Sequence, residues 1–195
     1  MKHRVAVYCA SSAGVDARYM RLAGRCGRSL AQAGFGLIYG GGQVGLMGAL
    51  ADGALDAGGE VIGIIPDFQS KELASRDPRV DLRIVESMHA RKALATSLAD
   101  GFIGLPGGYG TLEELFETVA LAKVGRIRGP IILLNDGGFF DALLDFVDIA
   151  RDTGFVNQRE RALLVAERTV SDAISRLDQT LRDSASSPRD ESAAE

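Results

Sequence analysis

The sequence lacks several features that would assign it to other classes of protein. It contains no tryptophan and only two cysteines, Cys9 and Cys26, whose separation fits neither a zinc site nor a redox motif. No apolar run is long enough to cross a bilayer, and the first four residues lead straight into an apolar segment without a signal-peptide core. We therefore expect a cytoplasmic protein with reduced cysteines, no bound metal and no membrane segment.

An excess of charge of one sign is also lacking. The chain has 22 lysines and arginines against 26 aspartates and glutamates, for a net charge of −4. This balance gives no general attraction to nucleic acid or to acidic membranes, so we expect a small-molecule partner instead. The Gly-Lys-Ser/Thr signature of a P-loop is absent as well, which argues against an NTPase.

What the sequence does contain is a regular alternation of short apolar runs and helical patterns. This alternation predicts an α/β fold with a doubly wound parallel sheet, Rossmann-like and built as a single domain. The domain is expected to span residues 1–183, and the small, polar residues 184–195 are expected to form a disordered tail. Strands are predicted at 4–9, 35–39, 61–65, 82–85, 102–105, 130–134 and 163–166. Helices are predicted at 16–33, 45–57, 87–98, 112–124, 139–151 and around 173–181, with 67–79 as a loop.

Ligands of such folds bind beyond the carboxyl ends of the strands. The segments that follow predicted strands at 10–14, 40–45, 86–92 and 106–111 are therefore expected to face one crevice. Residues 40–45, GGGQVG, satisfy the dinucleotide pattern G-x-G-x-x-G, but the expected acid at the end of the next strand is missing. Tight packing of the following helix and a phosphate-facing loop remain equally open for this segment.

The most informative stretch is PGGYGTLEE at 106–114, which joins an apolar strand to an apolar helix. Glycines let the backbone approach a ligand, and the amide groups of the following helix favour an anion. A phosphate cradle with two acids beside it indicates chemistry on a phosphorylated molecule. Thr111 and Glu114 also fit a capping box, with Thr111 as N-cap, which is the structural alternative for Glu114.

Arg91 and Lys92 fall about one turn into the helix predicted at 87–98. Paired cations usually lie on a solvated face, but near a helix N-terminus they oppose the helix dipole. Their position therefore hints at an anionic ligand or a nearby acid. His89 has no metal-ligand spacing to His3 or to either cysteine, which again predicts no metal site. Met47 and Met88 are expected to serve helix packing.

Taken together, three motifs resemble the LOG ("Lonely Guy") family of cytokinin riboside 5′-monophosphate phosphoribohydrolases, some of which are mislabelled lysine decarboxylases. The motifs are GGGQVGLMG at 40–48, MHARK at 88–92 and PGGYGTLEE at 106–114. The similarity extends from about residue 5 to residue 181. It implies hydrolysis of the N-glycosidic bond of AMP or N6-modified AMP to free base and ribose 5-phosphate, without a cofactor.

The resemblance also implies roles for individual residues. Arg91 and Glu114 match the catalytic pair of the family. The positions that match nucleotide contacts are Glu72, Lys92, Gly107, Gly108, Tyr109, Gly110, Thr111, Leu112 and Glu113. The chain departs from the family pattern at Ala10 and at ALAK, 120–123, both next to the proposed site.

The physical chemistry of the reaction fits the same residues. Breaking a ribosyl C–N bond builds positive charge on the sugar, and a carboxylate near C1′ stabilises that charge and orients a water. Glu114 suits this role, and the forked guanidinium of Arg91 suits a contact with ribose, phosphate or Glu114.

Two alternatives stay open, namely a general AMP nucleosidase and a non-catalytic nucleotide- or cofactor-binding carrier of the same fold. The resemblance further implies a homodimer or a larger even-numbered assembly. The predicted helix at 112–124 offers some support, because its apolar residues cover more than one face.

Overall fold

Seven strands form one parallel sheet in the part of the chain that the computed structural model describes, residues 3–12 and 14–186. The sheet order is β4-β3-β2-β1-β5-β6-β7. All neighbouring strands run parallel, as the alternating pattern predicted. The strands are β1 (Arg4–Tyr8), β2 (Gly36–Tyr39), β3 (Val61–Pro66), β4 (Asp81–Val85), β5 (Gly101–Gly104), β6 (Ile131–Leu134) and β7 (Leu164–Glu167).

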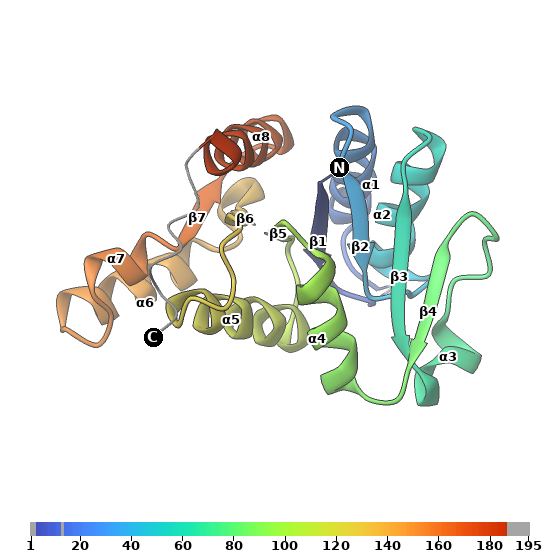
Figure 1. Ribbon diagram of the computed structural model, residues 1–195, viewed down its shortest axis with the longest axis horizontal. Helices are drawn as coiled ribbons and strands as arrows, with labels where there is room; N and C mark the ends of the chain where they lie inside the picture. The colour runs from blue at the N-terminus through green and yellow to red at the C-terminus, as the bar shows by residue number, and fades with distance from the viewer. Residues whose placement is uncertain (1–2, 13, 187–195) are drawn as a thin grey trace.

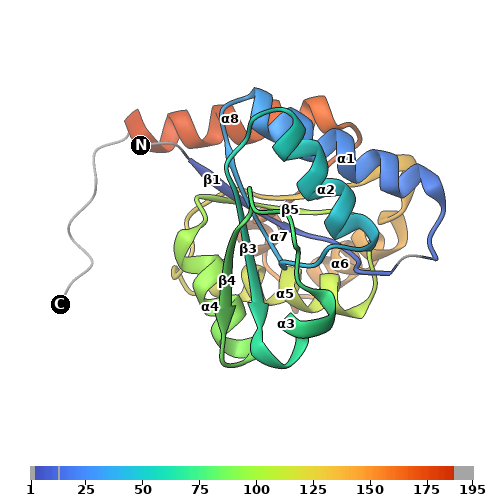
Figure 2. The same cartoon turned by 90° about the vertical axis from the view of Figure 1, so that its right-hand side faces the viewer.

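Helices cover both faces of this sheet (Figures 1 and 2). On one face lie α1 (Ala17–Gln32), α2 (Gly45–Asp56) and α8 (Val170–Ser186). On the other lie α4 (Met88–Leu98), α5 (Tyr109–Lys123) and α6 (Asp141–Asp152). Within β1, Val5 and Val7 enter the first layer, whereas Ala6 and Tyr8 enter the second. This alternation along a buried strand produces two separate apolar cores, and the doubly wound α/β prediction is confirmed.

Close packing of α1 on α2 depends on glycine. A Cβ on Gly27 would lie 2.0 Å from the carbonyl oxygen of Leu50, and one on Gly53 would lie 2.1 Å from that of Gly24. Gly45, at the start of α2, has a φ of +65°, and a Cβ there would meet the backbone of Ser11 at 2.6 Å. The sequence left two interpretations open for residues 40–45, tight helix packing and a phosphate-facing loop. At Gly45, the structure supports tight packing.

Three short helical segments differ from the sequence prediction. Residues expected to form a loop at 67–79 begin with a helix, α3 (Asp67–Leu73), none of whose residues is buried. A second short helix, α7 (Gln158–Arg161), was not predicted. The side chain of Asn157 caps this helix, and Glu160 forms the other half of the capping box. Neither helix buries an apolar face, so no periodic pattern reveals it. A single 3₁₀ turn at Asp136–Gly138 precedes α6.

The predicted boundary of the tail is also corrected. Helix α8 extends through Ser184 to Ser186, so these three residues do not belong to a disordered tail. The Ser184 hydroxyl donates to the carbonyl oxygen of Thr180 at 2.8 Å, within the helix. The apolar periodic pattern of this helix ends at Leu181, which is why the sequence prediction ends the domain early. The rest of the predicted tail, 187–195, lies outside the described residues.

Candidate active site

A cleft of about 250 Å³ opens at the carboxyl ends of β1 and β5. The chain runs outward from β1 to β4 on one side of the sheet and returns to β5 on the other side of β1. This reversal of strand order is the topological switch point, where open α/β sheets bind ligands. The lining comes from residues 9–12 after β1, Met47 of α2, Met88 and Arg91 of α4, and residues 108–111, 113 and 114 at the start of α5.

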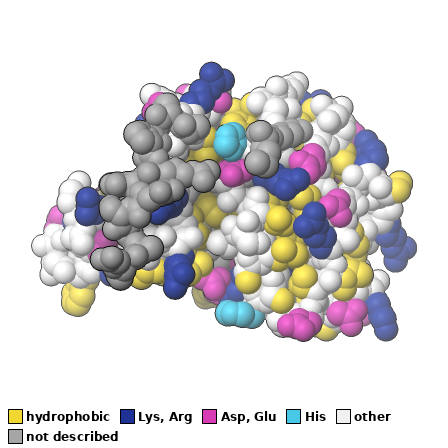
Figure 3. Space-filling model, viewed as in Figure 1, with side chains coloured by type: hydrophobic (Ala, Val, Ile, Leu, Met, Phe, Trp, Pro, Cys, Tyr) yellow, Lys and Arg dark blue, Asp and Glu magenta, His cyan; other side chains and the backbone are white. Residues whose placement is uncertain are grey.

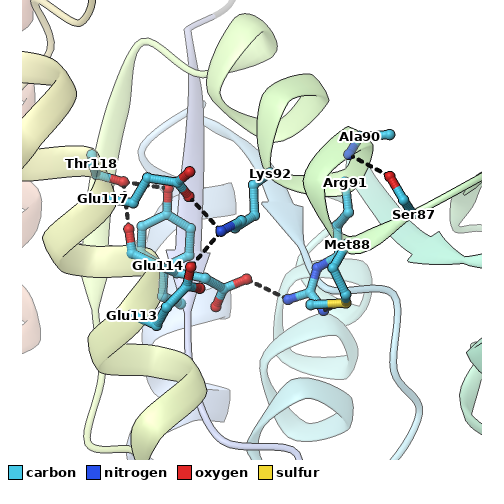
Figure 4. A network of polar contacts seen from close by, with 10 residues as sticks. Ser87, Met88, Ala90, Arg91, Lys92, Glu113, Glu114, Glu117 and Thr118 are labelled. Carbon is cyan, nitrogen blue, oxygen red and sulfur yellow. Dashed lines mark hydrogen bonds and ion pairs between the residues drawn. The ribbon is translucent and has the colours of Figure 1, made fainter.

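A buried ion pair forms the inner wall of the cleft. Arg91 and Glu114 are only 9% and 8% exposed, and Nη2 of Arg91 donates a hydrogen bond to Oε1 of Glu114 (Figure 4). Arg91 reaches this position because α4 begins directly after Ser87, whose side-chain oxygen accepts from the Ala90 amide at 3.1 Å. The structure therefore brings together the two residues that the resemblance assigned to catalysis, and Glu114 is the nearby acid that the position of Arg91 hinted at.

Compared with water, the environment of Glu114 favours the neutral form of its carboxyl group. Burial raises the pKa of the Glu114 carboxyl above its ordinary value, while the charge of Arg91 acts in the opposite direction. The positive charge in direct contact is the Arg91 guanidinium, which is itself nearly buried, and Lys92 adds a smaller effect of the same sign. A carboxylate with a raised pKa, lining a cleft and held by one cation, is typical of an acid–base or charge-stabilising group.

The start of α5 corrects the predicted capping box. The helix begins at Tyr109 with Gly108 as N-cap, and no side chain caps it. Thr111 is therefore the third helical residue, and Glu113 and Glu114 lie in the second turn, so no acid occupies the first turn. The glycines allow the helix to begin earlier than the apolar pattern suggests. The structural alternative for Glu114 is thus wrong, since its carboxylate contacts Arg91 and not the helix N-terminus.

The same start leaves an anion site open. The first amide groups of an α-helix have no acceptor within the helix, and their partial positive charge attracts anions. In α5 these amides belong to residues 108–111, which line the cleft. A Cβ on Gly107 would lie 2.1 Å from the Thr111 hydroxyl oxygen, so the turn into the helix requires glycine there. The tight turn and the amides without a helical acceptor are features that a phosphate cradle needs, and the cradle itself stays a prediction.

Lys92 joins the two helices beside the cleft. Its ammonium group contacts the Glu113 carboxylate and lies 3.0 Å from Oε2 of Glu117 (Figure 4). The Glu113 contact is the main cause of the raised pKa of Lys92. Lys92 does not line the cleft, so its contribution in this structure is to hold α4 against α5.

The remaining predicted site residues divide into two groups. Gly108, Tyr109, Gly110, Thr111 and Glu113 line the cleft, and Tyr109 is 94% exposed at its rim. Three others do not line it: Glu72 is exposed on α3, Gly107 shapes the turn, and the Leu112 side chain packs against the core beneath α5. Their predicted contacts with a nucleotide stay predictions.

Two lining residues were assigned to other roles from the sequence. Met47 and Met88 were expected to serve helix packing. Met47 does pack in the core, but it also lines the cleft. Met88 is 37% exposed and lines the cleft, where its Sδ lies 3.9 Å from Nη1 of Arg91. The segment 10–14 after β1 was expected to face the crevice, with Ala10 named beside the site but no role given to the serines. In the structure, residues 9–12 line the cleft. The position of this segment directly after the first strand was the available signal for Ser11 and Ser12.

Within the described ranges, no group of three or more histidine, cysteine, aspartate or glutamate side chains is placed to hold a metal. No helix in the same part of the chain is long and apolar enough to cross a membrane. On the face drawn in Figure 3, acidic and basic side chains are interspersed, without a broad region of one sign.

Comparison with known proteins agrees with this site. Residues 47–177, which include Arg91 and Glu114, match a family described as possible lysine decarboxylase. The chain is 40% identical to the cytokinin riboside 5′-monophosphate phosphoribohydrolase LOG of Oryza sativa subsp. japonica, over 90% of this chain and 73% of that protein. The chain belongs to the LOG family. A member from Rhodococcoides fascians, also named cytokinin riboside 5′-monophosphate phosphoribohydrolase, is 40% identical over 87% of this chain and 86% of its own length.

Solved structures share the fold of this LOG-family chain. The molybdenum cofactor binding protein of Rippkaea orientalis is 25% identical and superposes with a TM-score of 0.69, over 92% of this chain and 97% of that one. The molybdenum cofactor carrier protein of Chlamydomonas reinhardtii, at 24% identity, has a TM-score of 0.69 over 93% of this chain and 99% of its own and shows the fold alone.

The titration of Glu114 tests the electrostatics of the site directly. We expect its carboxyl, followed by NMR with carbon-13-labelled glutamate, to titrate above the ordinary value of 4.5. Arg91→Gln removes the one nearby group that strongly opposes this rise, so the Glu114 pKa should move further upward. A Glu114 pKa below 4.5, or a downward shift in Arg91→Gln, would contradict the assignment of burial as the dominant cause.

Proposed function

We propose that this chain hydrolyses the N-glycosidic bond of AMP or N6-modified AMP, including cytokinin riboside 5′-monophosphates, to free base and ribose 5-phosphate. The observation that supports this most directly is the buried Arg91–Glu114 pair beside an open helix N-terminus in one cleft. Family membership gives independent support, because curated relatives about 40% identical are named as phosphoribohydrolases.

The phosphate binds first in this scheme. The 5′-phosphate accepts hydrogen bonds from the free amides of residues 108–111, where the α5 dipole favours negative charge. Its position there directs the ribose toward the inner wall of the cleft, where Glu114 lies. A nucleoside without the phosphate loses this anchor and with it most of the orientation that the reaction needs.

Glu114 then acts at C1′. As the bond from C1′ to the base nitrogen breaks, its electron pair leaves with the base, and positive charge develops on the ribose. The Glu114 carboxylate stabilises that charge and orients a water, whose oxygen forms the new bond to C1′. Arg91 favours the ionised form of this carboxylate, against the effect of burial, and its hydrogen bond holds the carboxylate at the wall of the cleft. Overall, one water is consumed, its hydroxyl ending on the sugar and its proton on the base.

The name lysine decarboxylase fits this cleft poorly. Within the described part of the chain, no lysine lines it, and the nearby Lys92 is engaged by Glu113 and Glu117. A Schiff-base lysine requires an unpaired amine facing the ligand. The described residues therefore place no free lysine amine in the cleft for that chemistry, whereas phosphate binding and charge stabilisation at C1′ each have groups in place.

A carrier remains the second candidate because of one observation. The molybdenum cofactor binding protein of Rippkaea orientalis has the same fold and covers nearly the whole chain. A carrier would bind a ligand in the same cleft without turnover. Release of free base separates this candidate from the enzyme, and relative rates on AMP and N6-isopentenyl-AMP separate a general AMP nucleosidase from a cytokinin-directed enzyme.

The function is tested with a panel of AMP, N6-isopentenyl-AMP and adenosine, following free base by chromatography. We expect cleavage of the monophosphates in EDTA, because the catalytic groups are protein side chains. Adenosine should react at least about 100-fold more slowly in kcat/KM, the scale associated with losing an orienting contact. Equal rates on AMP and adenosine would refute the phosphate cradle, and loss of activity in EDTA would refute the mechanism.

Replacing Glu114 by glutamine tests the role of its charge. Glu114→Gln keeps an oxygen that accepts from Arg91 but removes the negative charge, so kcat should fall by about 10²–10⁴-fold. A matched control is Glu60→Gln, which alters the half-buried Arg4–Glu60 pair (2.7 Å) at the opposite end of the strands. That control should retain the parent rate. A Glu114→Gln protein that folds, by circular dichroism, and turns over like the parent contradicts the assignment.

The cytoplasm is the proposed compartment, because both cysteines are free and buried.

A homodimer is the proposed assembly, and the outer face of α5 is the surface that supports it. Leu115 of this helix is fully buried, but Phe116 is 39% and Val124 65% exposed. An apolar groove of about 250 Å³ runs between α5 and α6, and Phe146 of α6 adds a 63% exposed ring at its side. Such a surface on the helix that holds Glu114 suits a second copy of this chain.

Sedimentation velocity tests the assembly. The parent should sediment as a dimer or a larger even-numbered oligomer, and Phe146→Glu should shift it toward monomer by placing a charge in the apolar contact. Ile84→Glu is the matched control, since Ile84 is similarly exposed on the edge strand β4, away from the groove. A fully active parent monomer at assay concentration would refute the proposal.

A further inference from the structure

A chain of two buried hydroxyls connects the sheet to the backbone of Glu114. The hydroxyl oxygen of Tyr8, at the end of β1, lies 2.9 Å from Oγ1 of Thr118. Thr118 is one helical turn after Glu114 in α5, and its Oγ1 lies 2.8 Å from the carbonyl oxygen of Glu114 (Figure 4). Tyr8 is 8% exposed and Thr118 2%, so solvent does not compete for these bonds.

The direction of both hydrogen bonds follows from their chemistry. A carbonyl oxygen only accepts, so Thr118 donates its single hydroxyl proton to Glu114. Thr118 has no second proton, so Tyr8 must be the donor to Thr118. Burial raises the pKa of Tyr8 well above its ordinary value, which keeps that proton in place. The two bonds therefore point one way, from the sheet to Glu114.

The tyrosine ring is itself fixed. It stacks on Phe102 of the neighbouring strand β5, with ring centroids 6.3 Å apart and an interplanar angle of 24°. Thr96 of α4, the helix that bears Arg91, lies close enough to the Tyr8 hydroxyl to offset part of the rise of its pKa. The hydroxyl is thus bonded to α5, through Thr118, and lies near α4.

We propose that Tyr8 and Thr118 are positioning residues for the hydrolysis, holding the α5 turn that bears Glu114 at a fixed distance from β1 and from Arg91. This inference rests on the proposed function. Neither residue lies at the reacting atoms; each acts on the Glu114 backbone. A threonine that bonds back to the preceding turn tends to bend a helix. Here the hydrogen bond from Tyr8 of the sheet to Thr118 opposes that bending. This bond therefore helps to determine where the Glu114 carboxylate points.

The test uses three substitutions in the full chain and kinetics on AMP. Tyr8→Phe keeps the ring stack and removes the donor, and Thr118→Val keeps the shape of the side chain and removes both bonds. We expect kcat to fall about tenfold in each, a moderate loss for a misplaced catalytic group, with KM changed by less than about twofold. Thr118→Ser restores the hydroxyl and should recover most of the parent kcat.

The control is Tyr39→Phe, which removes the hydroxyl of a second buried tyrosine in the same sheet, one with no hydrogen-bond partner among the described residues. It should keep the parent kcat. If Tyr8→Phe and Thr118→Val both match Tyr39→Phe in kcat, or if Thr118→Ser is as impaired as Thr118→Val, the inference is overturned. Should Thr118→Val not fold, Tyr8→Phe decides alone. A parent that releases no base refutes the proposed function itself, an outcome distinct from an active parent with unaffected variants.

Discussion

The buried pairing of Arg91 with Glu114 is the interaction on which the organisation of the cleft depends. Removing a carboxylate and a guanidinium from water is costly, and the cost is offset only when the two groups meet with good geometry. Here each is about nine-tenths buried and each comes from a different helix. Because loss of one partner from such a pair typically costs about 3–5 kcal/mol, α4 and α5 are constrained to one relative position.

The surrounding structure maintains that position on several sides. The contacts of Lys92 with Glu113 and Glu117 join the same two helices at the more exposed side, and the Tyr8–Thr118 bond attaches α5 to the sheet beneath. The open N-terminus of α5 faces the same cleft. One rigid element therefore carries both the amide groups that lack helical acceptors and, one turn later, Glu114, an arrangement that suits the proposed substrate with a phosphate at one end.

Much of this arrangement was predictable from residue types and spacing. Short continuous apolar runs predicted a parallel sheet covered on both faces, and the segments after the strands predicted which loops meet. The glycines among residues 107–110 indicated a tight turn into a helix, which the structure shows, and the anion site inferred from them stays a prediction. The cations at 91–92 hinted at an anionic ligand or a nearby acid, and the structure shows the acid. The cleft-lining role of Met88, and the second role of Met47 beside its place in the core, were missed, because an apolar side chain on a helix looks the same in sequence whether it faces a core or a cleft.

The sequence by itself determined the fold class, the family and the identity of the two central residues, since these depend on local periodicity and on motifs that are contiguous in the chain. Only the tertiary structure decided that Glu114 pairs with Arg91 and does not cap α5, that Lys92 joins two helices, and that Tyr8 reaches Thr118. These contacts link residues from 21 to 110 positions apart. They depend on the order of strands in the sheet and on where each helix begins, which a local pattern does not encode.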